Sequence, residues 1–332
     1  MTIRVREARH DDYEAIAAFT QNTWPGRDGG DYIPRVYHDW LGDDDPQKHT
    51  VVAEVDGVVA GLAQTVLLSP WEAWNQGLRV NPDYRGRGVS TVITDDLFDW
   101  AREQGATVAR NMVFSWNAPG LGQSRATGYD PVTEFRWAHP DPDPDAEPNP
   151  DAELRSNVEP NADAALASAS AASAEFEITS NPDAAWRFWT DSAARDHFRG
   201  LALDDDESWA VSYLTREDLE RAADAGDLLV VQADGTAGFA HRVREFEREG
   251  GENDGSDGET ETWVEYGVGA WRDAASADAL FAAIARHAAD RGADRVRLPI
   301  PETVRAVSDA ALCRVEVSDD PDFVLAADLT VE

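Results

Sequence analysis

The chain has 332 residues, a hydrophobic fraction of 42% and a formal net charge of −35. This size and composition fit one large domain or two ordinary ones, and they argue against disorder throughout the chain. Nucleic acid and anionic membrane surfaces would repel so acidic a protein, so we expect neither as a partner.

Lysine and cysteine are both scarce. Lys48 is the one lysine among 29 basic residues, and Cys313 is the one cysteine. An acidic, lysine-poor composition resembles that of proteins from extreme halophiles, with an acidic mesophilic protein as the alternative. A single cysteine cannot form an internal disulfide, and neither a signal peptide nor a run of 18 apolar residues is present. These features predict a cytoplasmic location.

The first half reads as alternating strands and helices. Residues 3–5 form a short alternating strand, and an aromatic-rich helical stretch follows. Residues 51–63 predict a hairpin around Asp56-Gly57, which is a strong turn signal. A strand at 77–80 and a helix at 91–104 come next.

A low-complexity segment divides the chain. Residues 141–174 are rich in Pro, Ala, Ser and Asp, which form neither a sheet ladder nor a core face. We therefore predict a first domain at 1–140, an acidic linker at 141–174 and a second domain at 175–332.

The second half repeats the order of the first. A strand at 176–178 precedes an aromatic-rich helical stretch, a hairpin at 230–240 turns at Asp234-Gly235, and a strand at 263–268 precedes a helix at 277–291. The two Asp-Gly turns lie 178 residues apart. This order predicts a tandem duplication of one α/β unit. An acidic insert at 249–261 is expected to be a solvated loop.

The strongest chemical motif links the strand and helix of the first half. The loop 85–90 reads Arg-Gly-Arg-Gly-Val-Ser and opens an amphipathic helix. The first amides of a helix lack internal partners and carry partial positive charge, and two glycines let an anion approach them. The loop therefore predicts a phosphate site; a solvated turn or a nucleic-acid contact are the alternatives.

The loop also resembles a known family. Residues 85–90 match the acetyl-CoA signature [QR]-x-x-G-x-[GA] of the GNAT acetyltransferase superfamily, with Ser90 at the final position, and residues 78–84 resemble its usual lead-in. The resemblance covers residues 2–139. It implies an α/β (α+β) fold of two tandem GNAT-like domains, each a central mixed, mostly antiparallel twisted sheet flanked by helices.

The resemblance implies the following cofactor contacts. The backbone of Leu78 and Val80 should pair with the pantetheine arm of acetyl-CoA, the co-substrate. A fifth strand at 108–116 should splay from the fourth to admit it, and Asn117 should lie nearby. The amides of the loop should hold the pyrophosphate: Arg85, Gly86, Arg87, Gly88, Val89 and Ser90.

The candidate catalytic residues match the pattern of the family less closely than the loop does. Ser124 stands where the family often has a tyrosine that protonates the thiolate, and Tyr129 is either a core aromatic or the proton donor. Glu72 shares the strand parity of Leu78 and Val80, so it is either the general base or a surface acid. Trp71 and Trp74 either wall an acceptor pocket or belong to the core.

The second half lacks the glycine loop. Its equivalent segment keeps Arg272 but has no Gly-x-Gly pair after it, which predicts a degenerate GNAT-like copy without coenzyme A. His241 and His287 are expected at the surface or in helix packing rather than as ligands, and no metal-ligand cluster is present.

The predicted activity is acetyl-CoA-dependent N-acyltransfer, directly from the cofactor to an amine of a small molecule or peptide. The alternative is a non-catalytic acyl-CoA-binding or interaction module. A doubly wound nucleotide-binding domain is disfavoured, because no glycine-rich turn follows the first strand.

Overall fold

The computed structural model describes residues 1–21, 23, 30–42, 45–148, 176–249 and 260–331, and these form two compact units. The first unit comprises residues 1–132 and 323–332, and the second comprises residues 133–322. This division differs from the predicted ranges in two strands. The last strand of the chain belongs to the first unit, and residues 133–139 belong to the second. Which sheet a strand joins depends on long-range pairing, which local sequence patterns do not encode.

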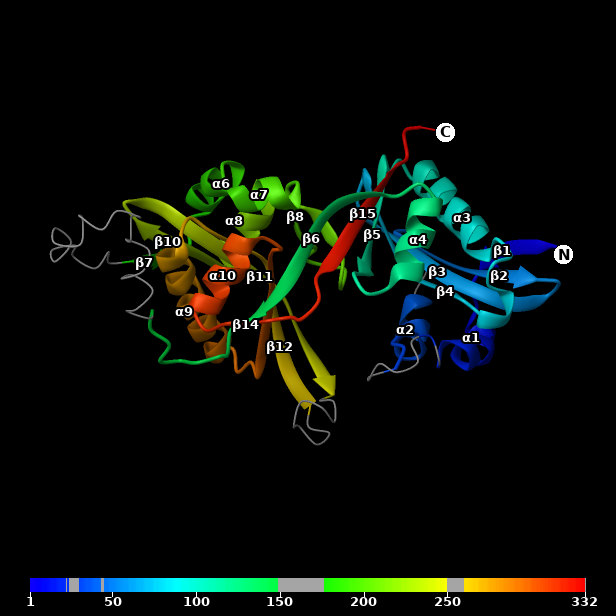
Figure 1. Ribbon diagram of the computed structural model, residues 1–332, viewed down its shortest axis with the longest axis horizontal. Helices are drawn as coiled ribbons and strands as arrows, with labels where there is room; N and C mark the ends of the chain where they lie inside the picture. Colours follow the sequence, from blue (N-terminus) through cyan, green and yellow to red (C-terminus); the bar gives the residue numbers. More distant parts are fainter. Residues whose placement is uncertain (22, 24–29, 43–44, 149–175, 250–259, 332) are drawn as a thin grey trace. The chain divides into compact units, whose positions relative to one another are not determined.

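The first unit has a mixed sheet with helices on both faces (Figure 1). The sheet order is β1-β2-β3-β4-β5-β15; β1 to β4 pair antiparallel with their neighbours, whereas β4 and β5 are parallel. Helices α1 and α2 cover one face, and α3 and α4 cover the other. The bounds are β1 (Ile3–Glu7), η1 (His10–Asp12), α1 (Tyr13–Thr20), α2 (Ile33–Trp40), β2 (Lys48–Val55), β3 (Val58–Ser69), β4 (Glu72–Val80), η2 (Pro82–Tyr84), α3 (Val89–Glu103), β5 (Val108–Phe114), α4 (Ala118–Ala126) and β15 (Asp322–Asp328).

The second unit has the same kind of sheet. Its strand order is β7-β10-β11-β12-β13-β6, and β14 pairs with β6. Among the described residues, β12 and β13 pair in parallel and the other neighbours within this order pair antiparallel. A short pair, β8–β9, lies off this sheet. The bounds are β6 (Asp130–His139), β7 (Glu177–Thr179), α6 (Pro182–Thr190), α7 (Ala193–Phe198), β8 (Leu201–Leu203), β9 (Val211–Tyr213), α8 (Arg216–Ala225), β10 (Leu228–Ala233), β11 (Gly235–Glu249), β12 (Thr260–Trp271), α9 (Ala274–Asp290), β13 (Arg295–Pro301), α10 (Val304–Leu312) and β14 (Glu316–Val317).

The predicted first hairpin is confirmed in detail. Val55 pairs with Val58, which leaves Asp56 and Gly57 as a two-residue turn. Both have positive φ, 50° and 86°, the backbone conformation of a type I′ turn. The Asp-Gly sequence suits this turn because neither residue is β-branched or bulky.

The first residues of the predicted linker belong to the second unit and bond to α9. The Asp143 N–H donates to the Ala285 carbonyl of α9 at 3.2 Å, and Arg286 of the same helix donates to the Ala146 carbonyl. Residues 149–174 of the predicted linker, and 250–259 of the predicted acidic loop, lie outside the described residues. Among the described helices, none combines the length and apolarity that a membrane crossing requires.

Candidate active site

Strands β4 and β5 separate partway along their length. They pair in parallel over three positions, from Glu72↔Val108 to Trp74↔Arg110, and no pairing follows. β4 nevertheless continues to Val80 and β5 to Phe114. The first unit therefore contains a divergence point between its parallel strands, directly after Trp74 and Arg110. The sequence resemblance predicted this splaying of the fifth strand from the fourth.

A β-bulge changes the direction of β4 just beyond the divergence point. Leu62 pairs with Arg79 and Gln64 with Gln76, so Gly77 and Leu78 together oppose one residue of β3. Gly77 has φ +66°, and a Cβ there would lie 2.2 Å from the Trp40 ring of α2. Only glycine fits this position, and the bulge leaves β4 backbone groups outside the ladder.

The bulge reverses the side-chain parity that the sequence predicted for Glu72. Ala73 packs against α3, so the adjacent Glu72 points to the opposite face of the sheet. Beyond the bulge, Leu78 and Val80 pack against α3. Glu72 and these two residues therefore face opposite sides, because the extra residue shifts the alternation by one.

Glu72 is also neither a surface acid nor an unengaged base. It is 2% exposed, and its Oε1 accepts from Arg110 Nη1 at 2.5 Å. Its Oε2 accepts from the Ser69 hydroxyl at 3.0 Å. Both oxygens are thus engaged, one in a buried ion pair and one with a hydroxyl, which argues against direct removal of an acceptor proton by Glu72.

The loop 85–90, which we call the cofactor loop, has the geometry of an anion site. Gly86 and Gly88 have φ of +71° and +84°, and Gly88 is the N-cap of α3. No side chain caps this helix, and the Val92 N–H is bonded back to the Gly88 carbonyl at 3.2 Å. The preceding helical amides thus lack an intrahelical partner.

The space beside the two loop glycines is open. A Cβ on Gly86 or Gly88 would meet no heavy atom within 4 Å. Arg85 and Arg87 are exposed, and the Arg87 guanidinium lies 5.1 Å from the centre of the Tyr84 ring. Open amides at a helix start, flanked by two arginines, suit a phosphate group.

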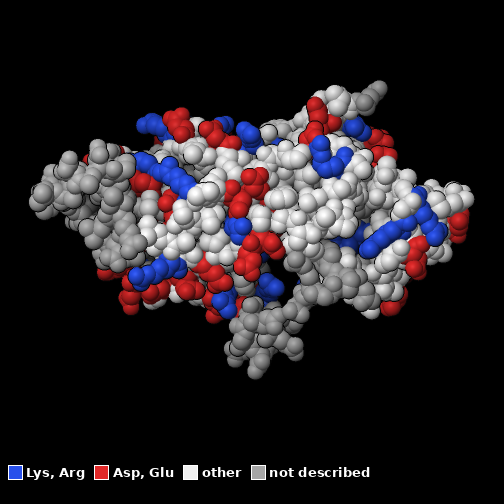
Figure 2. Space-filling model, viewed as in Figure 1, with Lys and Arg blue, Asp and Glu red and all other residues white. Residues whose placement is uncertain are grey.

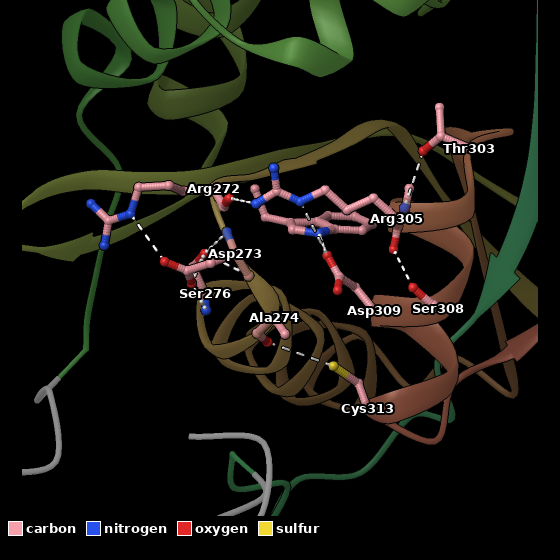
Figure 3. Close-up of polar contacts among 11 residues, drawn as sticks. Arg272, Asp273, Ala274, Ser276, Thr303, Arg305, Ser308, Asp309 and Cys313 are labelled. Carbon is pink, nitrogen blue, oxygen red and sulfur yellow. Dashed lines mark hydrogen bonds and ion pairs between the residues drawn. The ribbon is translucent and has the colours of Figure 1, made fainter. Parts of the chain in front are cut away.

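The start of α9 in the second unit, unlike that of α3, is capped by protein side chains (Figure 3). Asp273 caps α9: its Oδ1 accepts from the Ser276 N–H at 2.9 Å, and Ser276 Oγ accepts from the Asp273 N–H at 3.0 Å. Arg305 of α10 donates to the Arg272 carbonyl at the end of β12. A carboxylate therefore stands where an anion would meet these amides.

The other predicted residues lie around α4. Asn117 is the N-cap of α4, and its side chain accepts from the Gly120 N–H at 3.1 Å. Ser124 is 1% exposed, and its hydroxyl accepts from Asn111 Nδ2 at 3.0 Å. α4 thus forms despite Gly120 and Gly122, with the asparagine cap offsetting part of their cost.

Tyr129 lies in the core of the first unit. It is 3% exposed and its ring centre is 5.2 Å from that of Phe98 on α3. Its hydroxyl accepts from Asn75 Nδ2 at 2.7 Å. Burial raises the pKa of Tyr129 above its ordinary value, which favours the neutral phenol. This placement agrees with the core interpretation of Tyr129.

The two tryptophans of this region differ. Trp74 is 2% exposed and belongs to the core, whereas Trp71 is 48% exposed in the turn before β4. The Trp71 carbonyl accepts from the Thr107 N–H at 2.9 Å, so Trp71 lies at the paired end of β4 and β5. Trp74 therefore agrees with the core alternative, whereas the exposed Trp71 does not belong to the core.

Charged groups of both signs are distributed over the surface. On the face drawn in Figure 2, carboxylates and basic side chains are interspersed with uncharged surface. In the described ranges, no group of three or more His, Cys, Asp or Glu side chains is placed to hold a metal ion.

Comparisons with known proteins support an acetyltransferase relationship. Residues 7–121 match the family model described as Acetyltransferase (GNAT) family. A histidine N-acetyltransferase from Xenopus tropicalis is 36% identical over 87 residues, which is 26% of this chain and 25% of the relative. A streptothricin acetyltransferase from Streptomyces lavendulae is 32% identical over 93 residues, 26% of this chain and 47% of the relative. The chain thus spans less than half the length of these curated relatives.

Two solved structures resemble the fold over nearly the whole chain. A GCN5-related N-acetyltransferase from Sphaerobacter thermophilus has a TM-score of 0.57, with 98% of this chain and 96% of that chain covered at 15% identity. The structure of a glucosamine N-acetyltransferase region in a fungal multi-domain GH3 β-N-acetylglucosaminidase has a TM-score of 0.56, with 98% and 38% covered at 15% identity. At such identities the likeness concerns the fold alone.

Proposed function

We propose that the first unit is an acetyl-CoA-dependent N-acyltransferase. The observation that carries this proposal is the uncapped start of α3, where two glycines with positive φ leave the helix amides open. These amides, with Arg85 and Arg87, would hold the diphosphate of acetyl-CoA. The GNAT match over residues 7–121 supports the same site.

The two diverging strands would admit the arm of the cofactor. Beyond the bulge, the backbone of Leu78 and Val80 is the segment that would pair with the pantetheine amides, as an added strand would. Asn117 would lie beside the arm at the start of α4. The thioester would then lie near the divergence point, between β4 and β5.

Transfer would proceed in one chemical stage without a covalent enzyme intermediate. The acceptor nitrogen attacks the thioester carbonyl, the new C–N bond forms and the C–S bond breaks. The proton that the nitrogen loses ends on the sulfur, so coenzyme A leaves as the free thiol. A β4 amide between the bulge and Val80 would stabilise the oxyanion. The Ser124 hydroxyl is the candidate donor to the thiolate, since it accepts from Asn111 and its own proton remains available.

The second unit would be a degenerate copy of the first. Each unit has a β-bulge at a glycine, Gly77 or Gly267, and each has a parallel pair that stops after three positions. A helix follows in each, α3 or α9. These shared irregular features support a tandem duplication, and the Asp273 cap supports loss of coenzyme A binding in the second copy.

A small amine is the proposed acceptor class. The relatives acetylate histidine and streptothricin by name. The proposal is tested by measuring thiol release from acetyl-CoA with histidine and a panel of other amines. The assay uses high potassium chloride, because the composition of the protein resembles that of halophilic proteins. We expect amine-dependent thiol release, and its absence with every amine would contradict the enzymatic assignment.

The engagement of Glu72 by Arg110 favours the alternative of a non-catalytic acyl-CoA-binding module, because it removes the predicted base. This alternative shares the cofactor loop but predicts no turnover. Saturable binding of acetyl-CoA without thiol release would therefore select it.

A further inference from the structure

Three buried polar atoms of the first unit have no hydrogen-bond partner, and all three belong to neighbouring strands. They are Thr65 Oγ1 on β3, Asn75 Oδ1 on β4 and Asn111 Oδ1 on β5; no other described side chain of this unit has such an atom. Thr65 is fully buried and Asn75 is 7% exposed. We call these three residues the polar row.

The polar row lies at the divergence point. Thr65 and Asn75 are cross-strand partners, and Asn75 and Asn111 each come directly after the last paired position of β4 and β5. Asn75 bonds to Tyr129, which packs on α3, and Asn111 bonds to Ser124 of α4. The row therefore faces α3, whose start carries the cofactor loop, and α4.

Unpartnered buried polar atoms destabilise a folded protein, so most such atoms in native structures have a partner. Both asparagines use Nδ2 to bond a hydroxyl, and their Oδ1 atoms are left as acceptors. Three such atoms in one row, where two strands part, point to a ligand that supplies the missing hydrogen bonds.

The second unit has a partnered side chain at this position. Tyr266 comes directly after the last paired position of β12, as Asn75 does on β4. Tyr266 lies in the core beside α9, and its hydroxyl is 2.7 Å from His287 Nδ1 of that helix. The polar atom of the second unit therefore has a partner within the protein, whereas Asn75 Oδ1 has none.

We propose that the polar row binds the amide and thioester end of the acyl donor's arm. The asparagine oxygens accept its N–H groups, and the Thr65 hydroxyl donates to a carbonyl. This inference rests on the proposed function. It assigns to Thr65, Asn75 and Asn111 the positioning of the thioester, separately from the diphosphate contacts of the cofactor loop.

The test compares two ligands by isothermal titration calorimetry. Acetyl-CoA would engage both the cofactor loop and the polar row, whereas adenosine 3′-phosphate 5′-diphosphate keeps the diphosphate and lacks the arm. Thr65→Val removes only the unpartnered hydroxyl, and Asn75→Leu removes the amide. We expect each variant to weaken acetyl-CoA binding about five- to tenfold, the equivalent of one hydrogen bond, with binding of the armless diphosphate unchanged.

Thermal unfolding without ligand supplies the second readout. Thr65→Val should raise the Tm, because a buried unpaired hydroxyl disappears, while affinity for acetyl-CoA falls. The control is Thr20→Val on α1, whose hydroxyl bonds to the Ile16 carbonyl at 2.9 Å. It should lower the Tm and leave both affinities unchanged.

Each outcome decides the proposal. Unchanged acetyl-CoA affinity in Thr65→Val and Asn75→Leu would overturn the ligand role and leave the cofactor loop standing. Equal weakening for both ligands would mean a general structural effect and would also overturn it. If the unmodified protein bound neither ligand, the proposed function itself would fail, and the row's assignment with it.

Discussion

Replacement of Gly88 by alanine tests the cofactor loop with a change of one methyl group. Gly88 has φ +84°, and a Cβ would meet no heavy atom within 4 Å. In the unliganded protein the substitution therefore costs only the strain of a left-handed backbone, about 1–2 kcal/mol. Gly57 offers a matched control, since it has φ +86° and equally open space, but lies in the β2–β3 turn.

The two variants should differ in binding. The new methyl group of Gly88→Ala would project from the helix start into the space proposed for the diphosphate. Loss of one charge-assisted hydrogen bond is worth about 1.5–3 kcal/mol, so acetyl-CoA affinity should fall at least about tenfold. Gly57→Ala should lose similar stability and leave affinity unchanged.

Calorimetric titration with acetyl-CoA and thermal unfolding of the free proteins measure both quantities. Acetyl-CoA binding by Gly88→Ala as tight as that of the unmodified protein would contradict the diphosphate site at the start of α3, and so would equal weakening by Gly57→Ala.

Three further predictions concern other parts of the molecule. Glu72→Gln should destabilise the protein by about 3–5 kcal/mol in denaturant unfolding, because it leaves the buried Arg110 charge without its carboxylate; an unchanged unfolding midpoint would contradict the ion pair. His241 is buried with neither ring nitrogen bonded, and burial lowers its pKa from 6.5 to about 4, so stability is full above pH 6.5 and falls by about 3 kcal/mol as the pH drops to 4. His241→Leu should remove that part of the pH dependence of the Tm, and equal slopes for both proteins would count against it. Arg272→Ala should leave acetyl-CoA affinity unchanged, and a loss in titration would show that the second unit binds the cofactor.

Local features of the site were predictable from the sequence because they depend on neighbouring residues. Asp56-Gly57 specifies its turn through backbone preferences, and Gly86 and Gly88 specify the open start of α3 in the same way. The mixed sheet with flanking helices also follows from the order of periodic segments.

Register-dependent features were not predictable. The parity of Glu72 relative to Leu78 was wrong, because the bulge at Gly77 adds a residue that no periodicity reveals. The glycine itself was the available signal, since isolated strand glycines often mark bulges. The ion pair with Arg110 and the burial of His241 likewise depend on neighbours that are distant in the sequence, and His241 is not the surface residue that was one of the two expectations.

The polar row was missed for the same reason. Thr65, Asn75 and Asn111 are far apart in sequence and individually ordinary, and only pairing of their strands brings them into one row. The strand at 133–139 belongs to the second unit and the strand at 323–328 to the first. This assignment also depends on long-range pairing, for which the sequence carries no local signal.

The stoichiometry of acetyl-CoA binding tests the central claim most directly. Titration of the full chain should give saturable binding with one site per chain, because α3 has an open start and the start of α9 is capped by Asp273. Two equivalent sites would contradict the loss of binding in the second unit, and absence of binding would contradict the cofactor loop itself.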